Sequence, residues 1–249
     1  MEVYYNNRLF VTGGGYAVKL TPRLQAVADF VPRGSYVADI GTDHAYIPIY
    51  LVMTKRARRV LATDIKPGPV AAARQTLELF NLSKSVALRL GKGLAPLEAA
   101  DEIDTIIIAG MGGETICSIL ADGPPDLLTK ARLILQPMTD TSAVRRWLAN
   151  ENYRIIDENL AREGRKIYEV IVAEPGRQEE LAWLEFGPVL TANRHRLLAP
   201  LLRSRLNRLV KALDLAKGAK GERGLGRIGE INEQIGRLEE VLAWLKQPK

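Results

Sequence analysis

The sequence predicts an α/β protein with a doubly wound, mainly parallel Rossmann-like sheet of seven strands, followed by a C-terminal antiparallel helical hairpin. Two observations predict this. First, short apolar runs alternate with helix-like segments five times and end in two strands joined by Glu163-Gly164-Arg165. Such alternation gives a parallel sheet with helices on both faces. Second, leucine and isoleucine recur at coiled-coil spacing in the last third of the chain.

The stretch from Ser35 to Tyr46 is the expected first βα unit. A short apolar strand stops at Asp39, and Gly41 would allow the backbone to approach a ligand closely. Open α/β sheets bind ligands at the carboxyl ends of their strands. A Rossmann fingerprint has further glycines where Asp43 and Ala45 stand, so an ordinary strand-to-helix turn is an equally good interpretation of this stretch alone.

The remaining elements follow in order. Thr21-Pro22 predicts an N-cap and the first turn of a helix with an apolar face at Leu24, Val27, Ala28 and Val31. Strands are predicted at 36–40, 60–64, 86–90, 103–109 and 133–135, and helices at 45–54, 70–81, 115–120 and 141–150. Pro67-Gly68-Pro69 is interpreted as a turn, and Gly13-Gly14-Gly15 as a flexible joint after an arm that is hard to place. Residues 153–160 and 166–172 form the expected hairpin.

The tail contains two apolar seams, one from Leu202 to Ala216 and one from Ile228 to Leu245, separated by a glycine-rich turn. We expect the two seams to pack on each other, or on a third helix containing Trp183 and Leu184. The predicted domains are an uncertain N-terminal arm (1–18), the α/β domain (19–174) and the helical domain (175–249).

Composition excludes several classes of protein. Of the 249 residues, 47% are hydrophobic and 26% are charged, which is typical of a soluble globular protein. Cys117 is the single cysteine, so a disulfide within the chain is impossible and a reducing compartment is expected. Because no apolar run is long enough to span a bilayer and no signal pattern begins the chain, we expect a cytoplasmic protein that does not bind membranes.

Positive charge is concentrated near the C-terminus. The net charge is +6, and residues 175–249 contain 14 Lys and Arg against 9 Asp and Glu. Six cations lie between residues 194 and 211 without an acidic residue among them: Arg194, Arg196, Arg203, Arg205, Arg208 and Lys211. We expect all six to be accessible to solvent and to bind the phosphates of a nucleic acid. A solvated helix face is the alternative interpretation.

Two further strand ends carry candidate binding groups. Asp64 follows Asp39 by 25 residues, a spacing that suits an acid bound to a ribose diol, although it could also cap the next helix. Gly110-Met111-Gly112-Gly113 either exposes backbone to a ligand or forms a tight turn. His44 has no His or Cys partner at a metal-ligand spacing, so no metal site is expected.

Four linked segments carry a more specific resemblance: residues 39–48, 62–69, 108–116 and 132–138, with the 166–171 strand in support. Together they resemble the bacterial tRNA (adenine-N1)-methyltransferases that act on adenine 22. The resemblance covers residues 19 to about 174 well and the helical tail in character.

This resemblance implies a class I methyltransferase fold that uses S-adenosyl-L-methionine to methylate N1 of an adenine in tRNA. The cofactor-binding residues that it implies are Asp39, Gly41, Asp64, Ile65, Lys92, Gly93, Gly110, Met111 and Gly112. The resemblance implies that Lys92 and Gly93 lie near the adenine of the cofactor. Lys92 departs from the family pattern, in which an acidic or amide residue is usual at this place. Asp43 is the candidate carboxylate for stabilising the cationic product base, with His44 or Tyr46 orienting or stacking the base.

Three alternatives remain open. A methyltransferase of this fold could act on a small molecule or on a protein, although a small substrate does not need a basic helical tail. A non-enzymatic RNA-binding protein could have kept the fold, although Asp39, Gly41 and Asp64 are all present. A nicotinamide dehydrogenase fits less well, because the glycine fingerprint is missing.

Overall fold

A computed structural model describes residues 4–5, 9–12, 15–179, 183–217 and 222–247. The chain divides into two compact units, residues 1–189 and 190–249. None of the helices in the described part of the chain combines the length and apolarity that a membrane crossing requires.

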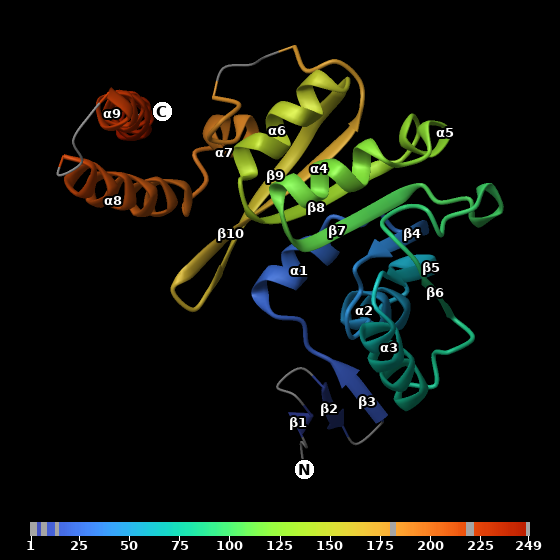
Figure 1. Ribbon diagram of the computed structural model, residues 1–249. Coiled ribbons are helices and arrows are strands. Elements are labelled where there is room, and N and C mark those ends of the chain that lie inside the picture. The colour runs from blue at the N-terminus through green and yellow to red at the C-terminus, as the bar shows by residue number, and fades with distance from the viewer. Residues whose placement is uncertain (1–3, 6–8, 13–14, 180–182, 218–221, 248–249) are drawn as a thin grey trace. The chain divides into compact units, whose positions relative to one another are not determined.

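The first unit is built on a seven-stranded sheet in the order β6-β5-β4-β7-β8-β10-β9 (Figure 1). Its strands are β4 (Ser35–Ile40), β5 (Ala57–Asp64), β6 (Val86–Leu90), β7 (Thr105–Gly112), β8 (Arg132–Thr139), β9 (Tyr153–Glu163) and β10 (Lys166–Pro175). The first five are parallel to one another, whereas β10 is antiparallel to both β8 and β9. The predicted mainly parallel, doubly wound sheet is therefore confirmed.

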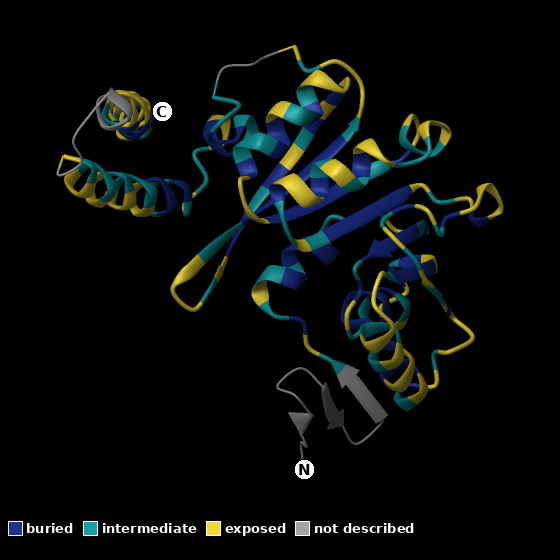
Figure 2. Cartoon of the chain, in the orientation of Figure 1, coloured by how far each residue is buried: buried dark blue, intermediate teal, exposed yellow. Residues whose placement is uncertain are grey.

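Helices cover both faces of this sheet, and each face has its own apolar core. The helices are α1 (Pro22–Asp29), α2 (Tyr46–Met53), α3 (Pro67–Leu79), α4 (Gly113–Ala121), α5 (Pro125–Leu128) and α6 (Thr141–Asn150), with a 3-10 turn at Ala99–Asp101. One core joins α1, α2 and α3 to strand residues such as Ile107, and the other joins α4 and α6 to residues such as Ile106. Consecutive strand residues point to opposite faces, so the isoleucines of β7 serve both cores (Figure 2).

Several boundaries differ from the sequence expectations. Pro67-Gly68-Pro69 is the first turn of α3 rather than a separate turn, because proline fits a position whose N–H needs no partner in the helix. β7 continues through the glycines to Gly112, past an irregularity between Ala109 and Met111. β8 likewise continues past Gln136-Pro137 to Thr139. Thr21 precedes α1 as predicted, but its side chain makes no capping hydrogen bond.

The N-terminal segment forms a small antiparallel sheet of β1 (Tyr4–Tyr5), β2 (Leu9–Thr12) and β3 (Gly15–Val18). The expected flexible joint is thus wrong at Gly15, which lies in β3. Gly13 and Gly14 lie outside the described residues.

The second unit contains most of α7 (Pro188–Ala192) and the helical pair α8 (Leu198–Ala216) and α9 (Glu222–Leu245), which pack on each other. The α9 seam is confirmed, since Ile231, Leu238 and Leu242 are buried. The glycine-rich turn is shorter than expected, because Gly224, Gly226 and Gly229 lie within α9. A third helix containing Trp183 and Leu184 is wrong: both lie in a turn, and Trp183 has a φ of 61°.

Candidate functional site

A cavity of about 530 Å³ opens at the carboxyl ends of β4, β5, β6 and β7. This volume is typical of small-molecule sites. Strand ends and the loops after them supply Ile40, Gly41, Thr63, Asp64, Ile65, Gly91, Lys92, Gly93, Ala109, Gly110 and Met111, and α4 supplies Glu114, Thr115, Ser118 and Ile119. Seven of the nine predicted cofactor residues therefore line one cavity. Asp39 and Gly112 are not in the lining.

The turn after β4 has the backbone conformation of a glycine-rich loop, although only one of its three residues with positive φ is glycine. Gly41, Asp43 and Ala45 have φ values of 75°, 53° and 57°. A Cβ on Gly41 would overlap the terminal methyl group of Met111, so a larger residue would require this flexible side chain to move, and the positive φ itself favours glycine. Asp43 and Ala45 adopt the left-handed conformation at a cost of about 1–2 kcal/mol each. The two positions where the sequence lacks the expected glycines thus keep the glycine conformation.

Two backbone donors fix the carboxylate of Asp64. Its Oδ1 accepts a hydrogen bond from the N–H of Lys66 at 3.0 Å, and its Oδ2 accepts one from the N–H of Asp43 at 3.4 Å. A carboxylate has about four lone-pair sites, so capacity remains for a ligand diol. The neighbouring Thr63 hydroxyl is buried and has no hydrogen-bond partner among the described residues. The cavity wall therefore contains both an oriented acceptor and an unsatisfied hydroxyl.

Asp39 lies beneath this wall as a buried acid that is 4% exposed. Burial raises the pKa of Asp39 to about 6, and the negative charge of Asp64 contributes to the same shift. A cationic ligand in the cavity would favour the ionised form of Asp39. Together with Asp64 and Glu114, this acid makes the site suitable for a ligand with positive charge.

Apolar side chains form the rest of the cavity surface. Ile65 is 58% exposed although it is a large hydrophobic residue, and Ile40 and Ile119 also line the cavity. An exposed isoleucine at a strand end offers a flat aromatic ligand an apolar surface. The arrangement therefore suits a ligand that combines an aromatic ring, a sugar diol and a cationic centre.

The Lys92 side chain, which was expected near the adenine of the cofactor, forms an ion pair with Asp122. Its Nζ lies 2.9 Å from Oδ2 of Asp122 in an exposed ion pair. Gly93 has a φ of 52°, and a Cβ there would lie 3.2 Å from Ile119. Gly91, Lys92 and Gly93 all line the cavity, with the Lys92 ammonium paired to Asp122.

The three candidate catalytic residues lie in the turn beside the cavity. The Asp43 side chain is exposed, and its Oδ1 lies 3.7 Å from Nε2 of His44. The His44 ring stacks on the Tyr46 ring with centroids 5.4 Å apart. Tyr46 is only 7% exposed, so His44 presents the more accessible ring. The structure brings the three together, with the Asp43 N–H bonded to the cavity acid Asp64.

The residues that sequence reasoning missed lie mainly on α4. Thr115, Ser118 and Ile119 line the cavity from one face of this helix. Their spacing of three and four residues places them on the same face, and this spacing follows directly after the glycine motif. The signal was therefore present in the sequence. By contrast, nothing in the sequence indicated that the Thr63 hydroxyl would lack a partner.

The six cations predicted to bind nucleic acid lie on or just before α8. Four are exposed, namely Arg196, Arg203, Arg208 and Lys211, whereas Arg205 is half-buried. Arg194 is engaged within its own unit. Its guanidinium lies 4.6 Å from the ring centroid of Trp244 and donates a hydrogen bond to the Gln247 carbonyl. The prediction that all six cations are freely accessible is wrong for Arg194.

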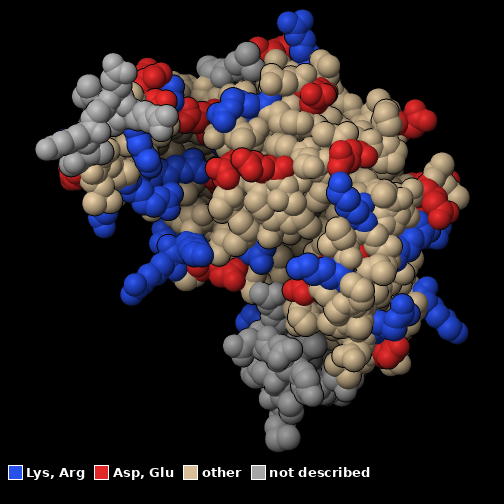
Figure 3. All heavy atoms as spheres, in the orientation of Figure 1, with Lys and Arg blue, Asp and Glu red and all other residues tan. Residues whose placement is uncertain are grey.

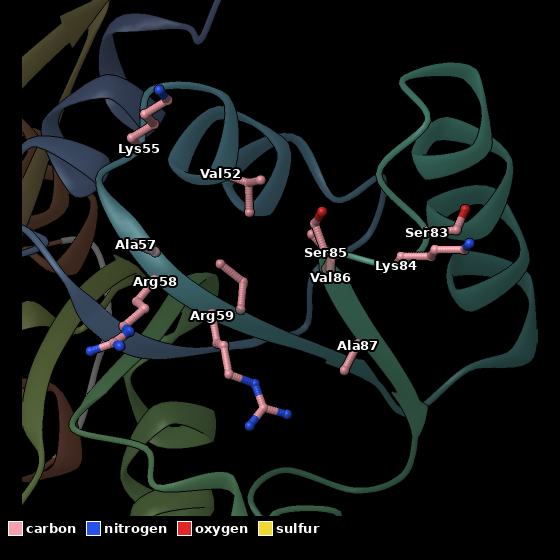
Figure 4. Close-up of a pocket in the computed structure, with 11 residues that line it drawn as sticks. Val52, Lys55, Ala57, Arg58, Arg59, Ser83, Lys84, Ser85, Val86 and Ala87 are labelled. Atoms are coloured by element: carbon pink, nitrogen blue, oxygen red, sulfur yellow. The ribbon is translucent and has the colours of Figure 1, made fainter.

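A second hollow, of about 550 Å³, lies at the amino ends of β5 and β6 (Figure 4). Its lining contains Lys55, Arg58, Arg59 and Lys84 but no acidic residue. Figure 4 shows these four side chains pointing in different directions, so they do not converge on one ligand. This hollow is at the opposite end of the strands from the cavity lined by Asp64. The described residues contain no cluster of three or more His, Cys, Asp or Glu that could hold a metal ion.

Comparison with known proteins gives a consistent result. A family described as a methyltransferase domain matches residues 20–171. The tRNA (adenine(22)-N(1))-methyltransferase of Bacillus subtilis (strain 168) is 35% identical over 233 residues, covering 90% of this chain and 98% of that protein. The crystal structure of the B. subtilis m1A22 tRNA methyltransferase TrmK superposes with a TM-score of 0.83 at 34% identity, covering 90% of this chain and 99% of that one. Streptococcus pneumoniae Sp1610 in complex with S-adenosyl-L-methionine superposes with a TM-score of 0.81 at 31% identity, covering 90% and 100%.

Proposed function

Because this chain belongs to the tRNA (adenine(22)-N(1))-methyltransferase family, we propose that it transfers the methyl group of S-adenosyl-L-methionine to N1 of adenine 22 in tRNA. The observation that carries this proposal is the cavity at the carboxyl ends of the parallel strands, where Asp64, the Gly41 turn and Gly110 at the end of β7 meet.

The residues of the cavity fit the cofactor. Asp64 would accept hydrogen bonds from the ribose diol, and Ile65 would lie against the adenine. The unsatisfied Thr63 hydroxyl offers a further polar contact, and Gly41 leaves room that a side chain would fill. Asp39 supplies buried negative charge near the cavity. When bound, the cofactor supplies a methyl group on a positively charged sulfur.

The reaction needs an unpaired target base beside this methyl group. N1 lies on the Watson–Crick edge, so adenine 22 must leave any base pair before it can react. The N1 lone pair forms a bond to the methyl carbon while the carbon–sulfur bond breaks, and positive charge moves from sulfur to the base. We assign Asp43 to the stabilisation of that charge, because its exposed carboxylate lies in the turn bonded to Asp64.

His44 would orient the target base. Its ring is stacked on Tyr46 and is the more exposed of the two. Tyr46 would then support His44 rather than stack on the base itself. Holding the base against the methyl donor supplies much of the acceleration expected for a one-step displacement.

The helical unit would bind tRNA through the exposed cations on and just before α8. Arg196, Arg203, Arg208 and Lys211 are exposed, and Figure 3 shows Lys and Arg side chains gathered over this helix. Phosphate contacts give affinity and orientation without reading sequence. A substrate that is a small molecule would not need these cations, which favours tRNA over a small molecule.

Mass analysis of tRNA nucleosides tests the proposal in cells. Deleting the gene should remove N1-methyladenosine from position 22 of the tRNAs that contain it, and reintroducing the gene should restore it. An unchanged nucleoside profile would contradict the proposal and leave a small molecule or a protein as the substrate.

A further inference from the structure

The turn of the β9–β10 hairpin carries three exposed cations: Arg162, Arg165 and Lys166. Within the part of the chain that the structure describes, their side chains form no ion pair with an acid, and Glu163 is the one acidic residue among them. Figure 3 shows Lys and Arg side chains over this turn. We call Arg162, Arg165 and Lys166 the hairpin cations.

Strand register places this turn at the same edge of the sheet as the cofactor cavity. β10 pairs with β8 at Ile171 and Leu135. On β10, Lys166 lies five residues before Ile171. On β8, the last residue, Thr139, lies four residues after Leu135. Because the two strands are antiparallel, both counts run toward the same edge of the sheet. The turn therefore lies past the carboxyl end of β8, as Figure 1 also shows. Thr139 in turn pairs with Gly112 of β7.

The distance along the sheet edge is short enough for one RNA strand to reach both places. Between β4, which Gly41 directly follows, and β10 lie only β7 and β8. Three strand spacings of about 4.8 Å amount to roughly 14 Å across the sheet, and the five residues from Ile171, which is level with the end of β4, to Lys166 add about 17 Å along the strand. The hairpin cations therefore lie roughly 22 Å from the end of β4, a distance that suits phosphates a few nucleotides from the reacting base.

Arg23 connects the cavity wall to the hairpin. Its Nη1 donates a 2.7 Å hydrogen bond to Oε1 of the buried Gln136, and its guanidinium lies 5.5 Å from the Tyr168 ring centroid. A Cβ on Gly110, in the cavity wall, would lie 3.6 Å from the same nitrogen. Alternation along β10 puts Lys166 on the same face as Tyr168. Positive charge thus continues from the cavity wall to the hairpin turn.

We propose that the hairpin cations form a second RNA-contact surface, which binds phosphates a few nucleotides from adenine 22 and so orients the RNA that presents the base to the cavity. This inference rests on the proposed function and adds the surface that positions the substrate. Backbone contacts of this kind orient a nucleic acid without specifying its sequence.

The test compares two triple variants with the same change in charge. The first is Arg162→Ala/Arg165→Ala/Lys166→Ala. The control is Lys55→Ala/Arg58→Ala/Lys84→Ala, which removes three exposed cations at the opposite end of the strands, around the hollow in Figure 4. Both sets are at the surface, and thermal melting verifies that each variant folds. Arg23 is kept, because its truncation would leave the buried Gln136 without this donor.

We expect the hairpin variant to bind tRNA at least about tenfold more weakly than the control. The slope of log affinity against log salt should fall by up to about 0.7–0.9 for each phosphate that is no longer bound. The KM for tRNA should rise while the KM for S-adenosyl-L-methionine stays the same. A second variant, Arg165→Glu/Lys166→Glu, should bind more weakly still.

Equal tRNA affinity and equal salt slope in the two triple variants would overturn the inference, whether both match the wild type or both are weakened. Affinity is measured separately from methylation. If the wild type failed to methylate tRNA, the proposed function would fall, and the binding comparison would still decide whether the hairpin contacts RNA.

Discussion

The N–H of Asp43 donates a hydrogen bond to Oδ2 of Asp64, with 3.4 Å between the nitrogen and the oxygen. This bond links the turn that carries the candidate catalytic residues to the acid that lines the cofactor cavity. Asp64 also accepts the N–H of Lys66, so one carboxylate orders the loops after both β4 and β5. Because the bond uses the backbone N–H of Asp43, a change of the Asp43 side chain keeps it, whereas a change of Asp64 removes its acceptor. We therefore expect cofactor affinity and catalysis to respond differently to changes at the two acids.

Replacing Asp64 should weaken cofactor binding. Asp64→Ala removes the proposed ribose acceptor, and hydrogen bonds to a charged group contribute about 1.5–3 kcal/mol. Isothermal titration with S-adenosyl-L-methionine measures the loss. Asp64→Asn, which keeps one carbonyl oxygen, is the control and should lose less. Equal affinity in Asp64→Ala and the wild type would place the cofactor elsewhere.

Replacing Asp43 should slow methyl transfer without changing cofactor affinity. Asp43→Asn keeps the backbone N–H that bonds to Asp64 and removes the side-chain charge. Loss of a group that stabilises developing charge should lower the single-turnover rate by about tenfold or more. An unchanged rate would show that the Asp43 carboxylate takes no part in the chemistry.

Stability should depend on pH through Asp39. Its pKa is about 6 in the folded protein, and the ordinary value of 3.8 applies in the unfolded chain. The folded state thus favours the protonated acid, so this contribution is fully present below about pH 4 and is lost as pH rises through 6. Relative to wild type, Asp39→Asn should gain up to about 3 kcal/mol of unfolding free energy between pH 4 and pH 8. Urea denaturation measures this difference, which would be constant with pH if Asp39 had an ordinary pKa.

The buried ion cluster at Arg145 should be essential for folding of the first unit. Arg145 is fully buried, and its guanidinium lies 2.7 Å from Glu158 and 2.8 Å from Glu169. Arg145→Ala leaves two buried carboxylates facing each other and should cost about 3–5 kcal/mol. Arg146, the exposed neighbour on the same helix, provides the control, because Arg146→Ala should change the free energy of unfolding by less than about 0.5 kcal/mol. Similar losses in the two variants would contradict this account.

The α8 cations should contribute salt-dependent affinity for tRNA. Arg203→Ala/Arg205→Ala/Arg208→Ala should flatten the salt dependence by up to about 0.7–0.9 log unit for each phosphate that these side chains no longer bind. The corresponding triple Lys variant retains the charges and should keep most of the slope. Circular dichroism verifies that α8 remains helical. A salt slope unaffected by the Ala variant would indicate a solvated helix face.

The local sequence pattern was sufficient to predict the bounds of the elements that end at a clear local signal. β6 has the bounds that were predicted, 86–90, and Gly91 follows it; α6 has the predicted bounds 141–150. The boundaries that differed depend on tertiary contacts. β7 and β8 continue past Gly110 and Pro137 because they pair with each other there, and no local signal specifies that pairing.

The same distinction holds for side chains. Gly41, Asp64 and Gly110 of the candidate site could be predicted to meet, because parallel strands bring their carboxyl ends to one edge. Outside the site, the Arg145 cluster could not be predicted, since it joins α6 to β9 and β10 across 13 and 24 residues of sequence. Arg194 appeared to be a surface cation, and only the packing of α9 shows that it lies on Trp244.

A single-turnover assay tests the central claim most directly. Purified wild-type protein is incubated with S-adenosyl-L-methionine carrying a labelled methyl group and with a tRNA transcript that has adenine at position 22, or with the same transcript carrying guanine there. The proposed function predicts one labelled methyl group per adenine-22 tRNA, recovered as N1-methyladenosine, and none in the guanine-22 transcript. Equal labelling of the two transcripts, or labelling at another atom of adenine, would contradict it.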